Sequence, residues 1–166
     1  SPRTGWPEGW SSSGARARAA AVLEQLSRAK FEGDVCRLSA RTAAHRAWTV
    51  VSVEYPILDV VFGHATAEPL RIRMICDQWN DLPPSIELLS ASGAHLRSAP
   101  PNVGSIFNGS AHPSTGRPFV CMRGSREFHT HSSHLGERWD GYRGKAGMDL
   151  LGILEQLWRG WKRAVG

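Results

Sequence analysis

The sequence predicts an α+β domain, with an N-terminal helix, a four-stranded antiparallel meander, a long loop region and a C-terminal helix. Two helical patterns lie near the ends of the chain, at residues 15–31 and 145–163. Between them, several short runs mix β-branched or aromatic residues in alternation with polar ones. The links between these runs are short, which favours antiparallel neighbours over the parallel strands of a dinucleotide-binding sheet.

Residues 1–14 predict a flexible arm in front of a single domain over residues 15–166. The arm has the sequence SPRTGWPEGWSSSG and is rich in Ser, Gly and Pro. It also contains Trp6 and Trp10. We expect these two amphipathic side chains to fold back onto the domain surface rather than to dock a partner.

The first predicted helix spans residues 15–31. Ser13 is suited to an N-cap, the alanines and arginines favour helix, and Gly33 is a suitable stop. The apolar residues at helical spacing are Val22, Leu23 and Leu26, and the stem of Lys30 extends the same stripe. This is the pattern of a helix that packs by one face.

Four runs have the composition of strands, namely residues 35–38, 48–55, 57–62 and 70–76. The last run alternates most regularly, with Leu70, Ile72, Met74 and Cys76 on one face and Arg71 and Arg73 on the other. Cys76 is therefore interpreted as a core residue. Cys36, within the first run, is interpreted as structural.

A rigid segment separates these strands from a long loop. Pro83 and Pro84 fix two φ angles and remove two amide donors, so the chain there is extended. Ile86 and Leu88 then resume an alternating pattern. Residues 90–117 are rich in Gly, Ser, Pro and Asn, and a loop of this length is commonly functional or disordered.

Residues 145–163 predict the second helix. Its apolar residues recur at spacings of one, three and four, and they are Leu150, Leu151, Leu154, Leu157, Trp158 and Trp161. Lys162 and Arg163 suit the negative end of the helix dipole. Gly152 and Gly160 each weaken the helix by about 1 kcal/mol relative to alanine, so tertiary packing must hold it.

The composition is that of an ordinary globular protein. Of 166 residues, 41% are hydrophobic and 21% are charged, and no apolar run approaches the ~20 residues needed to cross a membrane. The net charge of +5 comes mostly from scattered arginines without a basic-aromatic stripe, which does not favour nucleic-acid binding. Three widely spaced cysteines argue against a disulfide framework, so we expect a reducing cytoplasm.

Cys121 is the candidate reactive residue, within the stretch HPSTGRPFVCM at residues 112–122. Between Val120 and Met122, a cysteine can simply be part of a core. Its position between two loop-rich regions favours a reactive thiol instead. Three arginines close in sequence would stabilise a thiolate, and they are Arg117, Arg123 and Arg126. The residues after Cys121 are a poor helix start, which disfavours a cysteine protease.

Three histidines follow the cysteine in an H-x-H-x2-H pattern, namely His129, His131 and His134. With Cys121, Glu137 or Asp140, they could complete a four-ligand Zn²⁺ site. An exposed polar loop that happens to contain histidines is the simpler interpretation. A third hypothesis is that one histidine, with His129 as the candidate, acts as a base or adjusts the reactivity of the thiol.

Together, these elements resemble a ubiquitin-conjugating (E2) domain, specifically the divergent bacterial E2-like proteins. The resemblance covers roughly residues 15–160. It rests on the N-terminal helix, the four strands, the Leu-Pro-Pro before Ile86, the His112-Pro113 pair, the cysteine nine residues after His112, and a helix after the cysteine. The resemblance implies a UBC-like fold in which the long loop region holds the active site.

The resemblance also implies a transferase without a cofactor. An E1-like activating enzyme would pass a ubiquitin-like modifier to Cys121 as a thioester, and the modifier would then be transferred to an amine of a target protein. His112 and Pro113 match the loop that shapes the family's active site. In bacteria such sets of proteins often lie in operons linked to phage defence, and the resemblance implies that context.

The sequence departs from the family pattern at two positions. Ser114 stands where the family has the asparagine of its His-Pro-Asn motif, which stabilises the oxyanion, so the serine hydroxyl would take over part of that role. His129 stands eight residues after the cysteine, where a tryptophan is expected. Two alternatives stay open: a non-catalytic E2 variant that acts as an adaptor, and a zinc-binding protein that uses His129, His131 and His134.

Overall fold

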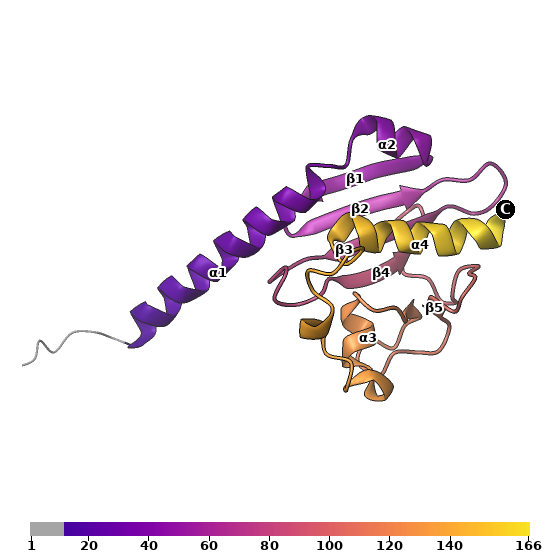
Figure 1. Ribbon diagram of the computed structural model, residues 1–166. Coiled ribbons are helices and arrows are strands. Elements are labelled where there is room, and N and C mark those ends of the chain that lie inside the picture. Colours follow the sequence, from indigo (N-terminus) through magenta and orange to yellow (C-terminus); the bar gives the residue numbers. More distant parts are fainter. Residues whose placement is uncertain (1–11) are drawn as a thin grey trace, which may run out of the picture.

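The computed structural model describes residues 12–166 and contains a four-stranded antiparallel sheet with a long helix lying across it (Figure 1). The strands follow one another as a meander in the order β1-β2-β3-β4. Their bounds are Trp48–Glu54, Ile57–Phe62, Leu70–Ile75 and Ser85–Leu89. The α+β class is thereby confirmed, with an N-terminal helix, an antiparallel sheet and a C-terminal helix.

Alternation along the strands decides which side chains form the core. The buried residues of one sheet face are Leu58, Val60, Phe62, Leu70, Ile72, Met74, Ile86 and Leu88. Helix α4 (Leu150–Val165) covers this face, and the rings of Phe62 and Trp161 are 5.9 Å apart there. Cys76 follows β3 and is fully buried, which confirms its interpretation as a core residue.

The strand prediction for residues 35–38 was wrong. Helix α1 (Ser12–Val35) continues to Val35, and the chain then turns into a short helix α2 (Ala40–His45). The fourth strand is instead β4, which follows Pro83 and Pro84. Cys36 is solvent exposed rather than structural, and its thiol donates a hydrogen bond to the carbonyl of Gly33.

Helix α1 begins earlier than predicted and buries a different face. Ser13 lies inside the helix instead of capping it, and residues 1–11 of the predicted arm, with Trp6 and Trp10, lie outside the described residues. The predicted apolar stripe faces solvent, with exposed fractions of 53% for Val22, 55% for Leu23 and 62% for Leu26. The N-terminal part of α1 projects from the body, and the buried residues near its other end are Ser27, Phe31 and Asp34 (Figure 1).

Helix α4 begins at Leu150 rather than at the predicted residue 145, and Leu151 and Trp158 of its predicted apolar face are only partly buried. Its buried residues are Leu150, Ile153, Leu154, Leu157, Gly160 and Trp161. A Cβ atom on Gly152 would lie 2.7 Å from backbone atoms of Gly147. A Cβ atom on Gly160 would lie 2.5 Å from the side chain of Ile106. Position 152 therefore requires glycine, because the neighbouring backbone cannot move aside, whereas at position 160 the end of the Ile106 side chain can shift.

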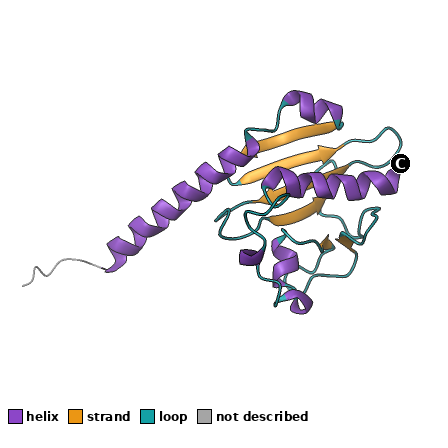
Figure 2. Cartoon of the chain, viewed as in Figure 1, coloured by secondary structure: helices purple, strands orange, loops and turns teal. Residues whose placement is uncertain are grey.

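The segment between β4 and α4 is mostly loop (Figure 2). Its regular elements are short: β5 (Phe107–Asn108), β6 (Phe119–Val120), α3 (Arg126–Thr130) and two 3-10 turns, η1 (Ser132–His134) and η2 (Trp139–Gly141). Strands β5 and β6 pair with each other, apart from the main sheet. This segment carries every residue that the sequence singled out for chemistry.

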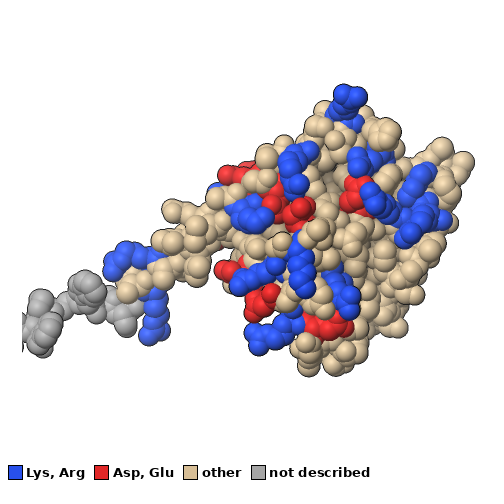
Figure 3. Space-filling view, viewed as in Figure 1, with Lys and Arg blue, Asp and Glu red and all other residues tan. Residues whose placement is uncertain are grey.

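Charged side chains of both signs are interspersed over the face shown in Figure 3, without a continuous basic stripe. On the sheet, Asp59 accepts hydrogen bonds from Arg71 and Arg73. Burial alone would raise the pKa of Asp59, but these two arginines hold it below its ordinary value. Along residues 12–166, none of the helices has the length and apolar character needed to cross a membrane.

Candidate functional site

Cys121 lies at the end of a short strand whose backbone is fixed on both sides. Its N–H donates a hydrogen bond of 2.8 Å to the carbonyl of Ile106. After the cysteine the chain turns sharply, and the Ser125 hydroxyl donates a 2.7 Å hydrogen bond back to the carbonyl of Val120. Gly124 adopts φ +95° in this turn, directly against the side chain of Ile153 on α4. The thiol is therefore presented from a well-supported turn.

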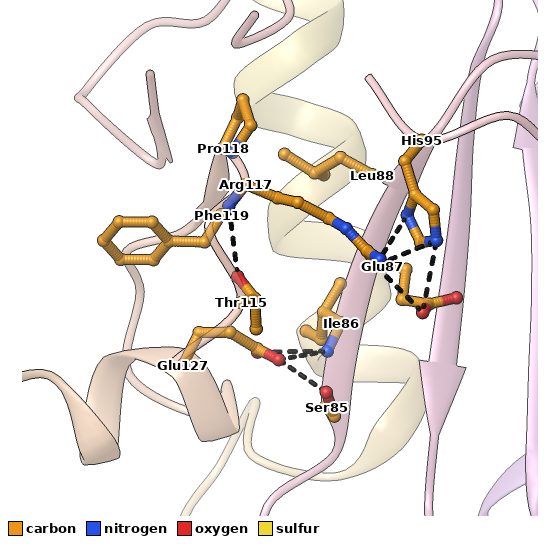
Figure 4. A pocket seen from close by; sticks show the side chains of 10 residues that line it. All are labelled: Ser85, Ile86, Glu87, Leu88, His95, Thr115, Arg117, Pro118, Phe119 and Glu127. Atoms are coloured by element: carbon orange, nitrogen blue, oxygen red, sulfur yellow. Dashed lines mark hydrogen bonds and ion pairs between the residues drawn. The ribbon is translucent and has the colours of Figure 1, made fainter. Parts of the chain in front are cut away.

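A buried carboxylate joins the segment after Cys121 to the main sheet (Figure 4). Glu127 on α3 accepts hydrogen bonds from the N–H of Ile86 and from the hydroxyl of Ser85, both on β4. Burial raises the pKa of Glu127. A cavity of about 50 Å³ lies beside this contact, and Cys121 is not among the residues that line it. The role of Glu127 is thus to hold α3 against β4.

His112 has a structural role in the loop before the cysteine. It is buried, its Nδ1 accepts a hydrogen bond from the N–H of Ser114, and its Nε2 donates to the carbonyl of Glu127. These contacts join the His-Pro loop to α3 but do not reach the thiol. Ser114 is exposed and makes no contact with Cys121 within the described residues, so the predicted catalytic use of these two side chains lacks a direct contact.

His129 is fixed in one neutral tautomer and is not beside the thiol. Its Nε2 accepts a hydrogen bond from the N–H of Gly124, and its Nδ1 donates to the carbonyl of Glu137. Both ring nitrogens are therefore engaged, and burial lowers the pKa of His129. In this arrangement the lone pair of His129 is used by Gly124 and does not face the thiol, so the predicted role of His129 as the base stays untested.

This arrangement predicts an acid-sensitive contribution to stability. The pKa of His129 is lower in the folded than in the unfolded chain, so below about pH 6.5 the unfolded chain binds the proton first. The stabilisation present above that pH is lost as the pH falls through the folded-state pKa. Glutamine keeps a donor and an acceptor but does not titrate. We therefore expect His129→Gln to lose less stability than the wild type as the pH falls.

The measurement is urea unfolding of both proteins between about pH 7.5 and about pH 5.5, the range in which histidine titrates. The free energy of unfolding should fall more steeply for the wild type than for His129→Gln as the medium is acidified. The raised pKa of Glu127 acts in the opposite direction, but it is common to both proteins. Parallel curves would show that His129 does not carry the predicted effect.

The histidine beside the thiol is His134. Its Nε2 lies 3.8 Å from Sγ of Cys121, and its Nδ1 lies 3.3 Å from Oε1 of Glu137. If Nδ1 carries the proton toward the carboxylate, Nε2 is left as an acceptor facing the sulfur. The ring also stacks on Phe128, with 3.9 Å between the ring centroids, which fixes its plane. The candidate nucleophile Cys121 thus contacts a candidate base, His134, which in turn contacts the orienting carboxylate of Glu137.

Glu137 is held as an anion by two donors. Its Oε2 accepts hydrogen bonds from Nε of Arg123 at 2.8 Å and from the hydroxyl of Tyr142 at 2.9 Å. The Arg123 hydrogen bond, followed by that of Tyr142, lowers the pKa of Glu137. The carboxylate is therefore ionised at neutral pH and keeps its other oxygen directed to His134. Glu137 is a positioning residue for the imidazole.

The partly exposed thiol opens into a shallow cavity of about 420 Å³. The walls include the apolar side chains of Met122, Phe128 and Met148, together with Arg123 and the His134–Glu137 pair. Within residues 12–166, the backbone N–H groups of Met122 and Arg123 donate no hydrogen bond. The two N–H groups directly after Cys121 are thus not used by hydrogen bonds within this part of the chain.

Of the three arginines predicted to stabilise a thiolate, one lies at the cavity of Cys121. Arg123 lines the Cys121 cavity through its contact with Glu137. Arg117 contacts His95 instead, and Arg126 binds Asp77 and the carbonyl of Pro83. These two cations belong to the sheet and the proline segment, so they do not face the thiol.

The three histidines do not converge as metal ligands. His129 uses both ring nitrogens in hydrogen bonds, and Nδ1 of His131 contacts the Ser133 hydroxyl. Only His134 faces Cys121. Among the described residues, no group of three or more His, Cys, Asp or Glu side chains is arranged to hold a metal ion. The zinc alternative therefore finds no ligand set in this arrangement.

Comparison with known proteins gives one partial similarity. A family model described as Y4jH-like, for the Y4jH family, matches residues 107–164, which are 58 of the 166 residues. The matched part runs from β5 into the last turn of α4 and includes Cys121, His134 and Glu137. No curated protein matches the sequence. The similarity thus covers the part of the chain that builds the candidate site.

Proposed function

We propose that this protein is an E2-like acyl carrier of UBC-like fold, which accepts the C-terminal acyl group of a ubiquitin-like modifier on Cys121 and passes it to an acceptor. The observation that carries the proposal is the open position of the thiol, 3.8 Å from a histidine that is oriented by an ionised carboxylate. That arrangement places a proton acceptor beside a thiol nucleophile, which is what acyl transfer through sulfur requires.

The fold supports the same reading. The order of helix α1, the four-stranded meander, the His112-Pro113 loop, the cysteine and helix α4 is compatible with an E2-like domain. An E1-like activating enzyme would be the natural acyl donor and a ubiquitin-like protein the modifier. The open cavity leaves room for an extended Gly-Gly tail to reach the sulfur. An adaptor without catalysis would not need the His134–Glu137 pair beside that thiol.

A chemical donor tests the proposal without a known modifier. We would incubate the protein with a short peptide that ends in Gly-Gly and is activated as a mercaptoethanesulfonate thioester, and follow acylation by mass spectrometry. Cys36 is also solvent exposed and serves as the internal reference thiol. We expect Cys121 to be acylated at least roughly tenfold faster than Cys36, in an adduct that dithiothreitol removes.

Two variants define the result. Cys121→Ala should abolish the fast adduct, whereas Cys36→Ala should retain it. Equal acylation rates at the two thiols would overturn the proposed function, because the cavity would then confer no reactivity beyond exposure. Formation of the fast adduct in Cys121→Ala would also overturn it, since the acyl group would be carried elsewhere.

A further inference from the structure

The His134–Glu137 pair bears on the chemical class of the acceptor. An amine can attack a thioester first and lose its proton afterwards, but a hydroxyl must lose its proton during the attack. A base in contact with the thioester is therefore essential for an oxygen nucleophile and dispensable for a nitrogen nucleophile. Here the acceptor nitrogen of His134 lies 3.8 Å from the sulfur that would carry the acyl group.

The charges around the cavity act against a lysine acceptor. Glu137 is the one carboxylate among the described residues that line the cavity, and Arg123, Tyr142 and His134 already bind it. Arg123 adds a guanidinium at the cavity wall. Because Arg123 and Glu137 neutralise each other, an incoming ammonium would find no unpaired carboxylate at the cavity wall to bind it, whereas a neutral hydroxyl needs none.

From these two observations, we infer that the acyl group on Cys121 is delivered to an oxygen nucleophile, namely the hydroxyl of a serine or threonine side chain. The inference rests on the proposed function, because it presupposes the thioester on Cys121. The resemblance to E2-like proteins implies an amine acceptor, so the inference departs from that expectation at the step after loading.

The transfer step balances without a co-reactant. The acceptor oxygen forms a bond to the thioester carbonyl carbon while its proton passes to Nε2 of His134. The tetrahedral intermediate collapses as the carbon–sulfur bond breaks, and the proton then moves from His134 to the thiolate of Cys121. The products are an ester of the acceptor hydroxyl and the free thiol, so the centre is ready for another acyl group.

The experiment separates loading from discharge. Cys36→Ala protein is loaded at Cys121 with the Gly-Gly peptide thioester, and excess donor is removed. The loaded protein is then mixed at neutral pH with N-acetyl-threonine amide, N-acetyl-serine amide or Nα-acetyl-lysine amide at equal concentrations, or with buffer alone. Mass spectrometry and sensitivity to mild base distinguish esters from amides.

We expect ester formation to exceed amide formation by roughly tenfold or more, because only the hydroxyl needs the base. His134→Ala, loaded to the same extent, should lose ester formation by about 100-fold while its slow amide formation is unchanged. His45→Asn, an exposed histidine on α2, is the matched control and should discharge like the parent protein.

Three results would overturn the inference without touching the proposed function. They are faster amide than ester formation, ester formation that survives His134→Ala, and loss of the thioester mainly to water at saturating acceptor concentration. Failure to load Cys121 at all would instead contradict the proposed function.

Discussion

Replacing His134 by alanine should slow the acylation of Cys121 by about 100-fold, while acylation of the exposed Cys36 stays unchanged. The reason is geometric. Nε2 of His134 is the proton acceptor that faces Sγ, and without it the thiol must ionise unaided. Both acylation rates are measured on the same molecule with the Gly-Gly peptide thioester. The ratio of the two rates is therefore independent of the protein concentration.

The orienting carboxylate should have a smaller effect. Glu137→Gln keeps an acceptor for Nδ1 of His134 but removes the negative charge, so we expect a loss of roughly tenfold. Added imidazole should partly restore acylation of His134→Ala, which a merely structural role of the ring would not explain. If His134→Ala reacts at the wild-type rate, the contact with the sulfur is chemically inert and the proposed relay is wrong.

The sheet could be predicted from the sequence because its signal is local. Alternation in residues 57–62 and 70–76 places every second side chain on one face, and the strand pairing of β2 with β3 confirms that grouping. The failed strand at residues 35–38 shows the limit of the method. A run of four residues has little information of its own, and there α1 simply continues to Val35.

The prediction that the apolar stripe of α1 packs against the domain was wrong for a different reason. Helical spacing indicates a face but not its partner, and the buried residues of α1 all lie in its C-terminal half. Val22 and Leu26 therefore stay exposed although their spacing is regular. Phe31, which the sequence did not single out, is the large side chain that α1 buries completely.

The sequence indicated Cys121 as the candidate thiol but not the side chains around it. The spacing from His112 to Cys121 singled out that cysteine, and the histidine-rich segment after it contains the imidazole that lies beside the sulfur. Which histidine meets the sulfur depends on the turn capped by Ser125 and on η1, and no periodic pattern encodes that direction. Glu137 was considered only as a metal ligand, because its bond to His134 arises in the folded chain.

Replacing Asp34 by alanine should destabilise the fold by about 3 kcal/mol, the expected effect of leaving two buried donors without an acceptor. Asp34 is a buried carboxylate at the C-terminal end of α1. It accepts hydrogen bonds from Nε1 of Trp79 at 3.0 Å and from the N–H of Leu150 at 3.3 Å, and it also pairs with Lys30. One side chain thus connects α1, the loop after β3 and the first turn of α4.

For a chain of this length, that loss corresponds to a fall in Tm of about 6–12 °C, measured by calorimetry or circular dichroism. Asp34→Asn should lose less, since it keeps one acceptor oxygen. Glu32→Ala removes an exposed carboxylate from the same helix and should change stability by no more than about 0.5 kcal/mol. A fall in Tm for Asp34→Ala no larger than that of Glu32→Ala would refute the network.

Asp34→Ala should also change the reactivity of Cys121, because helix α4 connects the two regions. Leu150 begins that helix, and Ile153, one turn later, packs directly against Gly124 in the turn after Cys121. Amide hydrogen exchange in the first turns of α4 should therefore accelerate in Asp34→Ala before the strands respond. The turn that presents the Cys121 thiol packs against the first turns of α4. Acylation of Cys121 should therefore slow relative to acylation of Cys36 in the still-folded variant. An unchanged ratio of the two rates would show that the nucleophile turn is held by its own hydrogen bonds to Ile106 and Val120 alone.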